Sequence, residues 1–291
     1  MAGDGSILIN LVPSLNSRKI NILLEAFSGT AHLLKAGIGD LLRLPEIDKT
    51  DAQEILRVRD SGLLEKEIKL IRKYDIITVD IFDTLYPVLL KETPGCPIVL
   101  YIKGNVALLN EPAIAVVGTR KPTAYSKIIA EKFSGQLASL GITIVSGLAL
   151  GIDTAAHKSA IRQGASIAVI GSGITNIYPW QNRGLAVKIT QKGALVSEFP
   201  LHSNPSADNI RRRNRVISGL ALGVLVVEAR LDDGPLMIAR IACEQNREVF
   251  AVPGIIGDGV NQGTNRLIKE GAKLVENVED VLEELNVKVT V

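Results

Sequence analysis

Cysteine, histidine and aromatic residues are scarce in this chain of 291 residues. The two cysteines, Cys96 and Cys243, stand far apart and without metal-ligand spacing, and there are only three histidines. These counts exclude a disulfide framework and a zinc cluster, and we expect two buried free thiols in a reducing compartment. Aromatic residues make up 4% of the chain, which argues against a binding surface built from many stacked rings.

Long apolar runs are missing as well. Residues 1–10 contain no basic stretch followed by an apolar one, so we expect no signal peptide. Elsewhere the apolar runs are interrupted by Gly, Asp or Arg well short of the ~20 residues that a membrane-spanning helix needs. The sequence therefore predicts a cytoplasmic protein with no membrane partner.

Net charge is low, at +2, but the charges are unevenly distributed. Residues 112–230 hold 14 Lys and Arg against five Asp and Glu, whereas residues 270–284 are rich in acids. A basic middle and an acidic tail would give the folded surface a dipolar field. Such a field attracts polyanions if the cations converge in the fold.

What the chain does contain is a regular alternation of apolar strand patterns and helical patterns. The expected strands, rich in Val, Ile and Ala, are residues 113–118, 142–147, 166–171, 224–228 and 248–254. Helical patterns lie between most of them, at 126–140, 154–163, 182–191 and 236–245. This alternation predicts an α/β domain over residues 112–291, with a Rossmann-like, doubly wound and mostly parallel sheet covered on both faces.

The preceding region has a different pattern. Short helices are expected at 20–26, 32–36, 40–44 and 52–74. We therefore predict a small all-helical N-terminal domain over residues 1–74, of helix-hairpin-helix or SAM-like type. A connecting stretch, 75–111, would lead into the sheet with one strand candidate at 98–103. The expected hairpin turn carries Glu46 and Asp48, which repel phosphate, so packing or partner docking is favoured over contact with nucleic acid.

One segment resembles a catalytic motif. Residues 79–85, with Asp83, resemble the first motif of haloacid-dehalogenase-type phosphatases, in which an Asp at a strand end is the nucleophile. That chemistry needs a second acidic cluster, which only Asp232 and Asp233 could supply, and Pro87 follows the motif at once. We favour a structural role, in which Asp83 caps a turn.

Glycines follow four of the five expected strands, at the edge where ligands of open α/β sheets bind. Glycine permits close approach of the backbone, and an arginine fork offers several donors to phosphate. Tyr178 and Trp180 lie near the third loop and could hold one or two bases. The candidate phosphate ligands of these loops are Gly118, Arg120, Lys121, Ser146, Gly147, Gly171, Gly173 and Asn176.

Two further segments are candidates. Residues 211–215 form the densest basic cluster, which we place at the start of a helix. Clustered cations oppose the helix dipole there unless an anion compensates, although a solvated basic face is the alternative. Residues 263–265 open the last helix and offer either another cradle of N–H groups or only a flexible loop. The candidate ligands here are Arg212, Arg213, Asn214, Arg215, Gly263 and Asn265.

Standard enzyme motifs are not found. There is no NTPase-type phosphate loop, no Gly-x-Gly-x-x-Gly with an acidic ribose ligand, and no metal-ligand cluster. Asp153 and His157, four positions apart, could form an acid–base pair, but a structural capping interaction is favoured because no nucleophile has suitable spacing. We expect no catalytic residue, no metal and no cofactor.

Together these segments resemble the DNA-processing protein A family, also called Smf. The resemblance rests on ordered blocks at 117–120, 146–153, 156–157, 170–173, 178–179, 197–198, 213–215, 226–229, 247–254 and 263–265. It implies a single-stranded-DNA-binding recombination mediator that loads a RecA-type recombinase, supports natural transformation and forms homodimers. The family's basic pocket would fall on Arg120 and residues 212–215.

The chain departs from the family at residues 210–211, Ile-Arg, where the family often has Phe-Pro, and at a loop further along. Two alternatives stay open. Residues 233–235, Asp-Gly-Pro, stand where the family usually has Ser-Gly-Ser, which counts against phosphate binding there. One alternative is a nucleotide-hydrolysing enzyme of phosphoribohydrolase type. Its Pro-Gly-Gly-x-Gly-Thr motif is split here between residues 253–254 and 263–264, with no Glu before Glu270. The other is an interaction module that docks a recombinase without contacting DNA.

Overall fold

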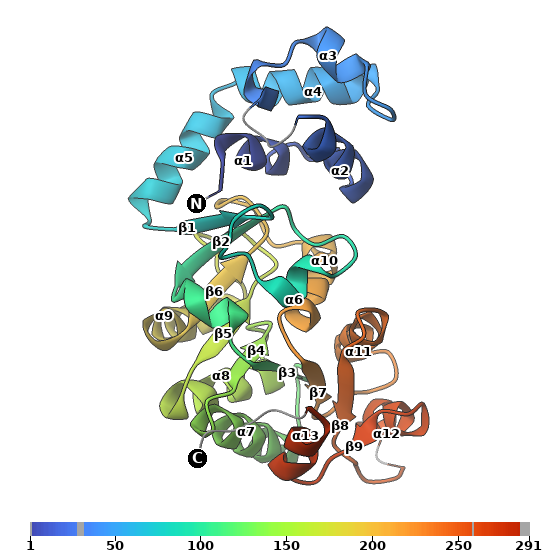
Figure 1. Cartoon of the computed structure of the whole chain (residues 1–291). Helices are drawn as coiled ribbons and strands as arrows, with labels where there is room; N and C mark the ends of the chain where they lie inside the picture. Colours follow the sequence, from blue (N-terminus) through green and yellow to red (C-terminus); the bar gives the residue numbers. More distant parts are fainter. Residues whose placement is uncertain (1, 28–31, 258, 286–291) are drawn as a thin grey trace.

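The computed structural model describes residues 2–27, 32–257 and 259–285. Its centre is a nine-stranded sheet in the order β1-β2-β6-β5-β4-β3-β7-β8-β9, with a group of helices packed against one end (Figure 1). The strands are β1 (Ile77–Asp80), β2 (Val99–Gly104), β3 (Ala113–Val117), β4 (Thr143–Ser146), β5 (Ser166–Val169), β6 (Ala194–Ser197), β7 (Gly223–Val226), β8 (Glu248–Ala251) and β9 (Lys273–Leu274).

The helices fall into two sets. Those before the sheet are α1 (Asp4–Asn10), α2 (Ser17–Ala26), η1 (His32–Lys35), α3 (Ile38–Leu42), α4 (Lys49–Asp60) and α5 (Leu63–Lys73). Those interleaved with the strands are α6 (Val88–Lys91), η2 (Val106–Asn110), α7 (Ala124–Ser139), α8 (Ile152–Gln163), η3 (Trp180–Asn182), α9 (Arg183–Lys192), α10 (Ala207–Gly219), α11 (Gly234–Glu244), α12 (Gln262–Lys269) and α13 (Val278–Leu285).

The sheet is parallel from β3 to β9 and antiparallel only where β1 and β2 join it. Its central strands are buried on both faces. On β3, Ala115 and Val117 pack with α10 and α11, while Ile114 and Val116 pack with α7 and α8. Such continuous burial is why the strands read as unbroken apolar runs. The predicted Rossmann-like, mostly parallel sheet with preceding helices is confirmed.

Three strands are absent from the sequence prediction: β1, β6 and β9. β9 has only two residues, too few to show a period. β1 and β6 have four residues each, as many as the predicted β4 and β5, so length alone does not explain their absence from the prediction. The expected connecting stretch, 75–111, therefore contributes both β1 and β2 to the sheet, of which the sequence indicated only the second. The division of the chain into domains stays a prediction.

The helical region differs from expectation at two places. The predicted single helix over 52–74 is interrupted at Gly62, which adopts a left-handed φ of 74° between α4 and α5. This conformation is readily available to glycine but disfavoured in other residues. The first helix, α1, was not predicted, and its Ile7, Leu8 and Ile9 are buried.

One apolar core joins the helical region to the sheet. It contains Leu8 and Ile71 from the helices together with Tyr101 of β2 and Ile189 of α9. Buried polar contacts cross the same boundary. The backbone N–H of Leu201 donates to Glu67 Oε1 at 2.8 Å, for example. The two regions are therefore packed as one body.

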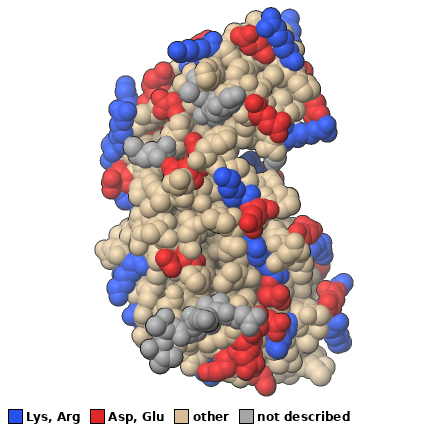
Figure 2. All heavy atoms as spheres, in the orientation of Figure 1, with Lys and Arg blue, Asp and Glu red and all other residues tan. Residues whose placement is uncertain are grey.

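The remaining sequence expectations concern charge, thiols and the membrane. Acidic side chains gather over α13 at the lower end of the face in Figure 2. Both cysteines are free, but Cys243 is exposed and Cys96 only half-buried, so the expected burial is wrong. Among the described residues, no helix combines the length and hydropathy that crossing a bilayer requires.

Candidate functional site

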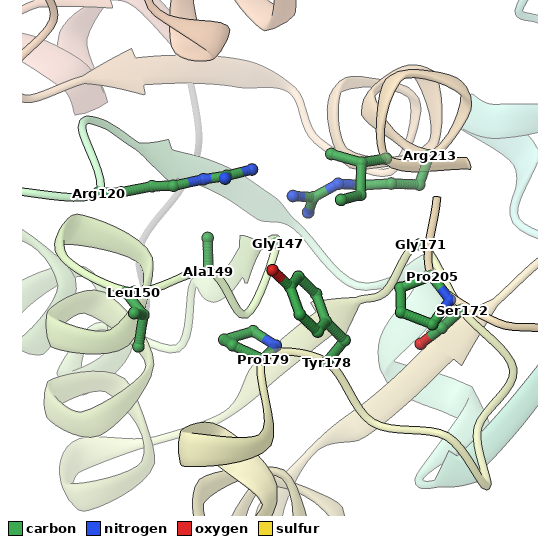
Figure 3. A pocket seen from close by; sticks show the side chains of 11 residues that line it. Arg120, Gly147, Ala149, Leu150, Gly171, Ser172, Tyr178, Pro179, Pro205 and Arg213 are labelled. Carbon is green, nitrogen blue, oxygen red and sulfur yellow. The ribbon is translucent and has the colours of Figure 1, made fainter. Parts of the chain in front are cut away.

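The site lies where the chain order of the sheet reverses. β3 is flanked by β4 on one side and by β7 on the other, and ligands of open α/β sheets bind beyond the strand ends at such a point. Two adjoining hollows open there, both lined by Arg120, Ala149, Ile210 and Arg213. We call them together the arginine pocket (Figure 3).

Arg120 is presented by the loop between β3 and α7. Glu228, fully buried, anchors this loop at two points. Its backbone carbonyl accepts from Thr119 N at 2.8 Å, and its Oε2 accepts from Thr123 Oγ1 at 2.7 Å. The exposed Arg120 side chain therefore extends into the pocket from a loop that is fixed on both sides of it.

Arg213 approaches from the opposite side, on α10, and the two guanidinium groups point toward each other (Figure 3). Arg213 is only 6% exposed. Its Nη1 donates to Val169 O at 3.1 Å, while its Nε is buried without a partner. Burial lowers the pKa of this guanidinium; the charge of Asp153 opposes that shift and the charge of Arg120 adds to it. A buried, under-bonded cation of this kind is stabilised by an anion.

Gly147 makes the position of Arg213 possible. A Cβ at residue 147 would overlap the guanidinium of Arg213. The loop itself is shaped by Asp153, whose Oδ2 accepts from Gly147 N at 3.1 Å and Ala149 N at 3.2 Å. Burial raises the pKa of Asp153, against the opposing charge of Arg213.

Asp153 and His157 have different partners, which leaves no support for an acid–base pair. His157 Nδ1 lies 2.7 Å from Ser166 Oγ. Burial, with the charge of Arg213, lowers the pKa of His157 to about 3. The ring is therefore neutral near pH 7 and serves the packing of α8 on β5.

Aromatic and apolar side chains surround the mouth of the pocket. Tyr178 is 47% exposed, and its hydroxyl points toward the gap between the two guanidinium groups in Figure 3. Leu150 lies on the same side, and Trp180, two residues beyond Tyr178, is 68% exposed. Exposed rings beside a basic pocket offer surfaces on which nucleic-acid bases stack.

Half of the predicted ligands meet in this pocket. Those that line it are Gly118, Arg120, Lys121, Gly147, Gly171, Arg213 and Asn214. Lys121 and Asn214 extend it toward Arg230, and Asp232 and Asp233 form its far rim. The rim is acidic, as residues 233–235 suggested.

Arg212 and Arg215 lie elsewhere. The basic cluster is not at the start of its helix, as expected: α10 is capped by Ser206, so residue 211 already falls in its second turn. Both guanidinium groups of Arg212 and Arg215 turn to the buried Glu198, with Arg215 Nη1 at 2.6 Å from Oε1. They line a separate hollow between the helical region and the sheet, visible at the right of Figure 2.

The other predicted ligands have internal partners. The Ser146 hydroxyl donates to Val116 O at 2.7 Å, and Asn176 Nδ2 donates to Asn204 Oδ1 at 2.8 Å. The backbone N–H of Gly173 donates to Ser203 O. Near the last helix, Gly263 N donates to Ala229 O, and the Asn265 amide both accepts from and donates to the Gly254 backbone. None of these five lines the arginine pocket.

Several pocket residues could not be recognised from the sequence. Ile210 and Pro205 form one wall, but nothing in their local sequence marks them. Glu228 carried a signal, since it ends an apolar strand with a buried charge, yet its role as an anchor depends on a loop more than 100 positions earlier.

The residues considered for catalysis have structural partners and do not lie together in one site. Asp80 Oδ2 accepts from Gly3 N and Ser6 Oγ, so it joins α1 to the sheet, and Asp83 Oδ1 accepts from Leu85 N, which confirms the predicted turn cap. Glu270 pairs with Arg266 at 2.7 Å beside a different hollow. Over residues 2–27, 32–257 and 259–285, no group of three or more His, Cys, Asp or Glu could hold a metal ion.

Comparison with known proteins gives the same assignment as the motifs. Residues 77–286 match the family described as DNA recombination-mediator protein A. Protein Smf of Escherichia coli is 48% identical over 202 residues, which cover 69% of this chain and 54% of that protein. DNA processing protein DprA of Bacillus subtilis is 41% identical over 76% of this chain and 75% of its own length.

Two solved structures extend the likeness to the fold. The X-ray structure of DprA from Streptococcus pneumoniae matches with a TM-score of 0.86 and 34% identity, over 98% of this chain and 99% of that one. DprA of Helicobacter pylori, in a structure described as giving insight into its single-stranded DNA binding mode, matches with a TM-score of 0.66 and 30% identity, over 72% of this chain and 95% of that one. The chain spans about half of the E. coli relative and three quarters of the B. subtilis relative. This chain belongs to the DNA recombination-mediator protein A family.

Proposed function

We propose that this chain is a recombination mediator that binds single-stranded DNA, with the strand's phosphates held in the arginine pocket. The observation that carries the proposal is Arg213, a buried guanidinium with an unpartnered Nε, directly opposite the exposed Arg120. The buried Asp153 lines the same pocket, and its Oδ2 already accepts from two backbone N–H groups. The pocket lining holds four cations, Arg120, Lys121, Arg213 and Arg230, against three acids, Asp153, Asp232 and Asp233. It therefore keeps a net positive charge that a phosphodiester would balance.

The proposal is one of binding without catalysis. His157 is neutral and committed to Ser166, and Glu270 lies at another hollow. The competing enzyme hypothesis predicts release of free base from nucleoside monophosphates. Incubation with these compounds, followed by chromatography, would support it if base appeared and if an Arg120→Ala variant produced none.

Membership of the family supports three further parts of the proposal: loading of a RecA-type recombinase, a role in natural transformation, and action in the cytoplasm as a homodimer. For the dimer there is also a structural argument. β9 is an edge strand of the sheet, and its apolar Leu274 is 41% exposed. Uncovered edges and apolar patches favour association.

The direct test is fluorescence anisotropy with a labelled single-stranded oligonucleotide at two salt concentrations. Arg120→Ala removes an exposed side chain, so we expect at least a tenfold loss of affinity with an unchanged melting temperature. Arg211→Ala is the matched control, since Arg211 is exposed but does not line the pocket. Equal affinity of Arg120→Ala and wild type would rule out the arginine pocket as the binding site.

A further inference from the structure

A second basic surface lies beside the arginine pocket, in the groove between α8 and α9. These helices pack side by side at the left of the sheet in Figure 1. The groove is lined by two exposed cations from each: Lys158 and Arg162 from α8, and Lys188 and Lys192 from α9. No Asp or Glu lines it. Within the described part of the chain, none of the four forms an ion pair.

The four cations form two parallel rows. Each pair is separated by four positions, so its members lie on one face of their helix, about 6 Å apart along the axis. Like charges at this spacing destabilise a helix. The helix dipole favours Arg162 and Lys192, which are in the last turns, but Lys158 and Lys188 lie one turn earlier and gain little from it. Among the described residues, the positive charge of these two rows is therefore not balanced by nearby acids.

The groove begins where the arginine pocket ends. Its near end is formed by Gln181 and Asn182, and the pocket is lined by Tyr178 and Pro179 of the same turn. Asn182 Nδ2 donates to Leu148 O at 2.8 Å, which fixes this turn to the loop that carries Gly147. Only this one turn separates the two surfaces.

The separating turn carries the ring surfaces that a strand would need in order to cross it. Tyr178 is 47% exposed and Trp180, the single tryptophan of the chain, is 68% exposed. An indole that is neither buried nor part of a core is well placed to stack on a base. Aromatic side chains interleaved with a basic track are the usual features of single-strand binding surfaces.

We propose that the α8–α9 groove is a second contact surface for the same DNA strand that the arginine pocket holds. The strand leaves the pocket over Tyr178 and Trp180, and its phosphates follow the two rows of cations. This inference rests on the proposed function and extends it to a longer DNA footprint. An acidic protein surface is the competing occupant; the repeated axial spacing and the aromatic turn favour nucleic acid.

The test compares two lengths of labelled oligothymidine, one of about 4 nucleotides, which fills the pocket alone, and one of about 20 nucleotides. The groove variant is Lys158→Gln with Lys188→Gln. We expect a loss of about tenfold in affinity for the long oligonucleotide and no change for the short one. The slope of log affinity against log salt should fall by about 1.4, because each phosphate contact contributes about 0.7 on a single strand. Trp180→Ala should weaken binding of the long oligonucleotide more than binding of the short one.

The matched control is Lys127→Gln with Lys132→Gln, two exposed lysines of the neighbouring α7 that lie outside the groove. It removes the same charge and should leave both affinities unchanged. Thermal melting checks folding, and the groove variant should melt at or slightly above the wild-type temperature, because two repulsive pairs are relieved.

The outcomes separate this inference from the proposed function. If the wild type bound neither length, both would fail. If Arg120→Ala weakened both lengths but the groove variant left the long one unchanged, the proposed function would stand and the groove would be excluded. If the groove variant kept its DNA affinity but no longer captured a purified RecA-type recombinase in a pull-down, the groove would be a protein-docking surface. The inference would then be overturned.

Discussion

At the scale of single residues, the pocket depends on the pairing of Gly147 with Arg213. The guanidinium occupies the space that any side chain at position 147 would fill. The glycine is therefore required by close approach of a neighbour. It adds no ligand atom beyond its backbone, and its N–H already donates to Asp153.

We expect Gly147→Ala to displace Arg213 and to lower affinity for a single-stranded oligonucleotide at least tenfold, measured by anisotropy. Gly39→Ala is the matched control, since a Cβ at Gly39 in α3 would meet open space. The control should keep full affinity and gain up to about 1 kcal/mol of stability, because alanine is the better helix former. Retention of wild-type affinity by Gly147→Ala would contradict this account of the pocket.

His157 predicts a pH dependence of stability. Its pKa is lowered to about 3 in the folded protein, against an ordinary value near 6.5. Between these values the unfolded chain binds a proton that the folded protein does not. The stability that neutral His157 provides is therefore complete above about pH 6.5 and is lost as the pH falls through the folded pKa.

We expect the unfolding free energy of the wild type to fall more steeply than that of His157→Asn between about pH 6 and 4, by about 1.4 kcal/mol per pH unit. Asparagine retains a donor near the position of Nδ1, toward Ser166, but does not titrate. Urea titrations at several pH values measure the difference. Parallel pH profiles for the two proteins would show that His157 is already accessible to protons.

At the scale of elements, the arginines of α10 have two different roles. Arg213 faces the pocket, whereas Arg215 and Arg212 hold Glu198. Neighbouring residues of a helix project about 100° apart, so a contiguous basic cluster cannot serve one site. Of the three, only Arg213 is directed at the proposed ligand.

The two roles predict opposite phenotypes. Arg213→Gln should abolish binding of the oligonucleotide at low salt while retaining most of the stability. Arg215→Gln should leave binding intact but lower stability by about 3 kcal/mol, since it strands the buried carboxylate of Glu198. Parallel anisotropy and urea titrations of both variants measure this. If Arg215→Gln lost affinity for the oligonucleotide while its stability stayed unchanged, Arg215 would be a DNA ligand and not a partner of Glu198.

The same helix shows what the sequence could and could not predict. The central strands were predictable because burial on both faces makes them continuous apolar runs, and the loops of Gly118, Gly147 and Gly171 follow from the strand ends. β1 and β6 were not predicted, although they are as long as β4 and β5. Arg212 pairs with Glu198, whereas Arg213 lines the pocket. This difference depends on the rotation of α10 about its axis and on the position of Glu198, directly after β6. Such long-range placement has no local signal.

At the scale of the whole molecule, the helical region and the sheet share one apolar core and buried polar contacts. Glu67 illustrates the connection: this α5 side chain accepts from the Leu201 backbone, and burial raises its pKa. All residues that line the arginine pocket, however, belong to the sheet region. Stability is therefore shared across the boundary, whereas the proposed binding site is not.

A chain that begins at residue 75 should accordingly keep its affinity for a short oligonucleotide but melt at least about 5 °C lower, since a few kcal/mol of lost packing shifts the midpoint by that much at this size. Calorimetry and anisotropy on the truncated and full chains measure the two properties. An unchanged midpoint would mean that the shared core adds nothing. Loss of short-oligonucleotide binding would mean that the helices reach the pocket.

The acidic rim formed by Asp232 and Asp233 has a consequence for the direction of a bound strand. On one side of the two arginines a phosphate meets carboxylates, and on the other it meets the aromatic turn and the cations of α8 and α9. The potential across the pocket is thus asymmetric, and a strand seated in it has a single downhill exit. Each molecule bound to a long strand would therefore cover more nucleotides on one side of its pocket than on the other.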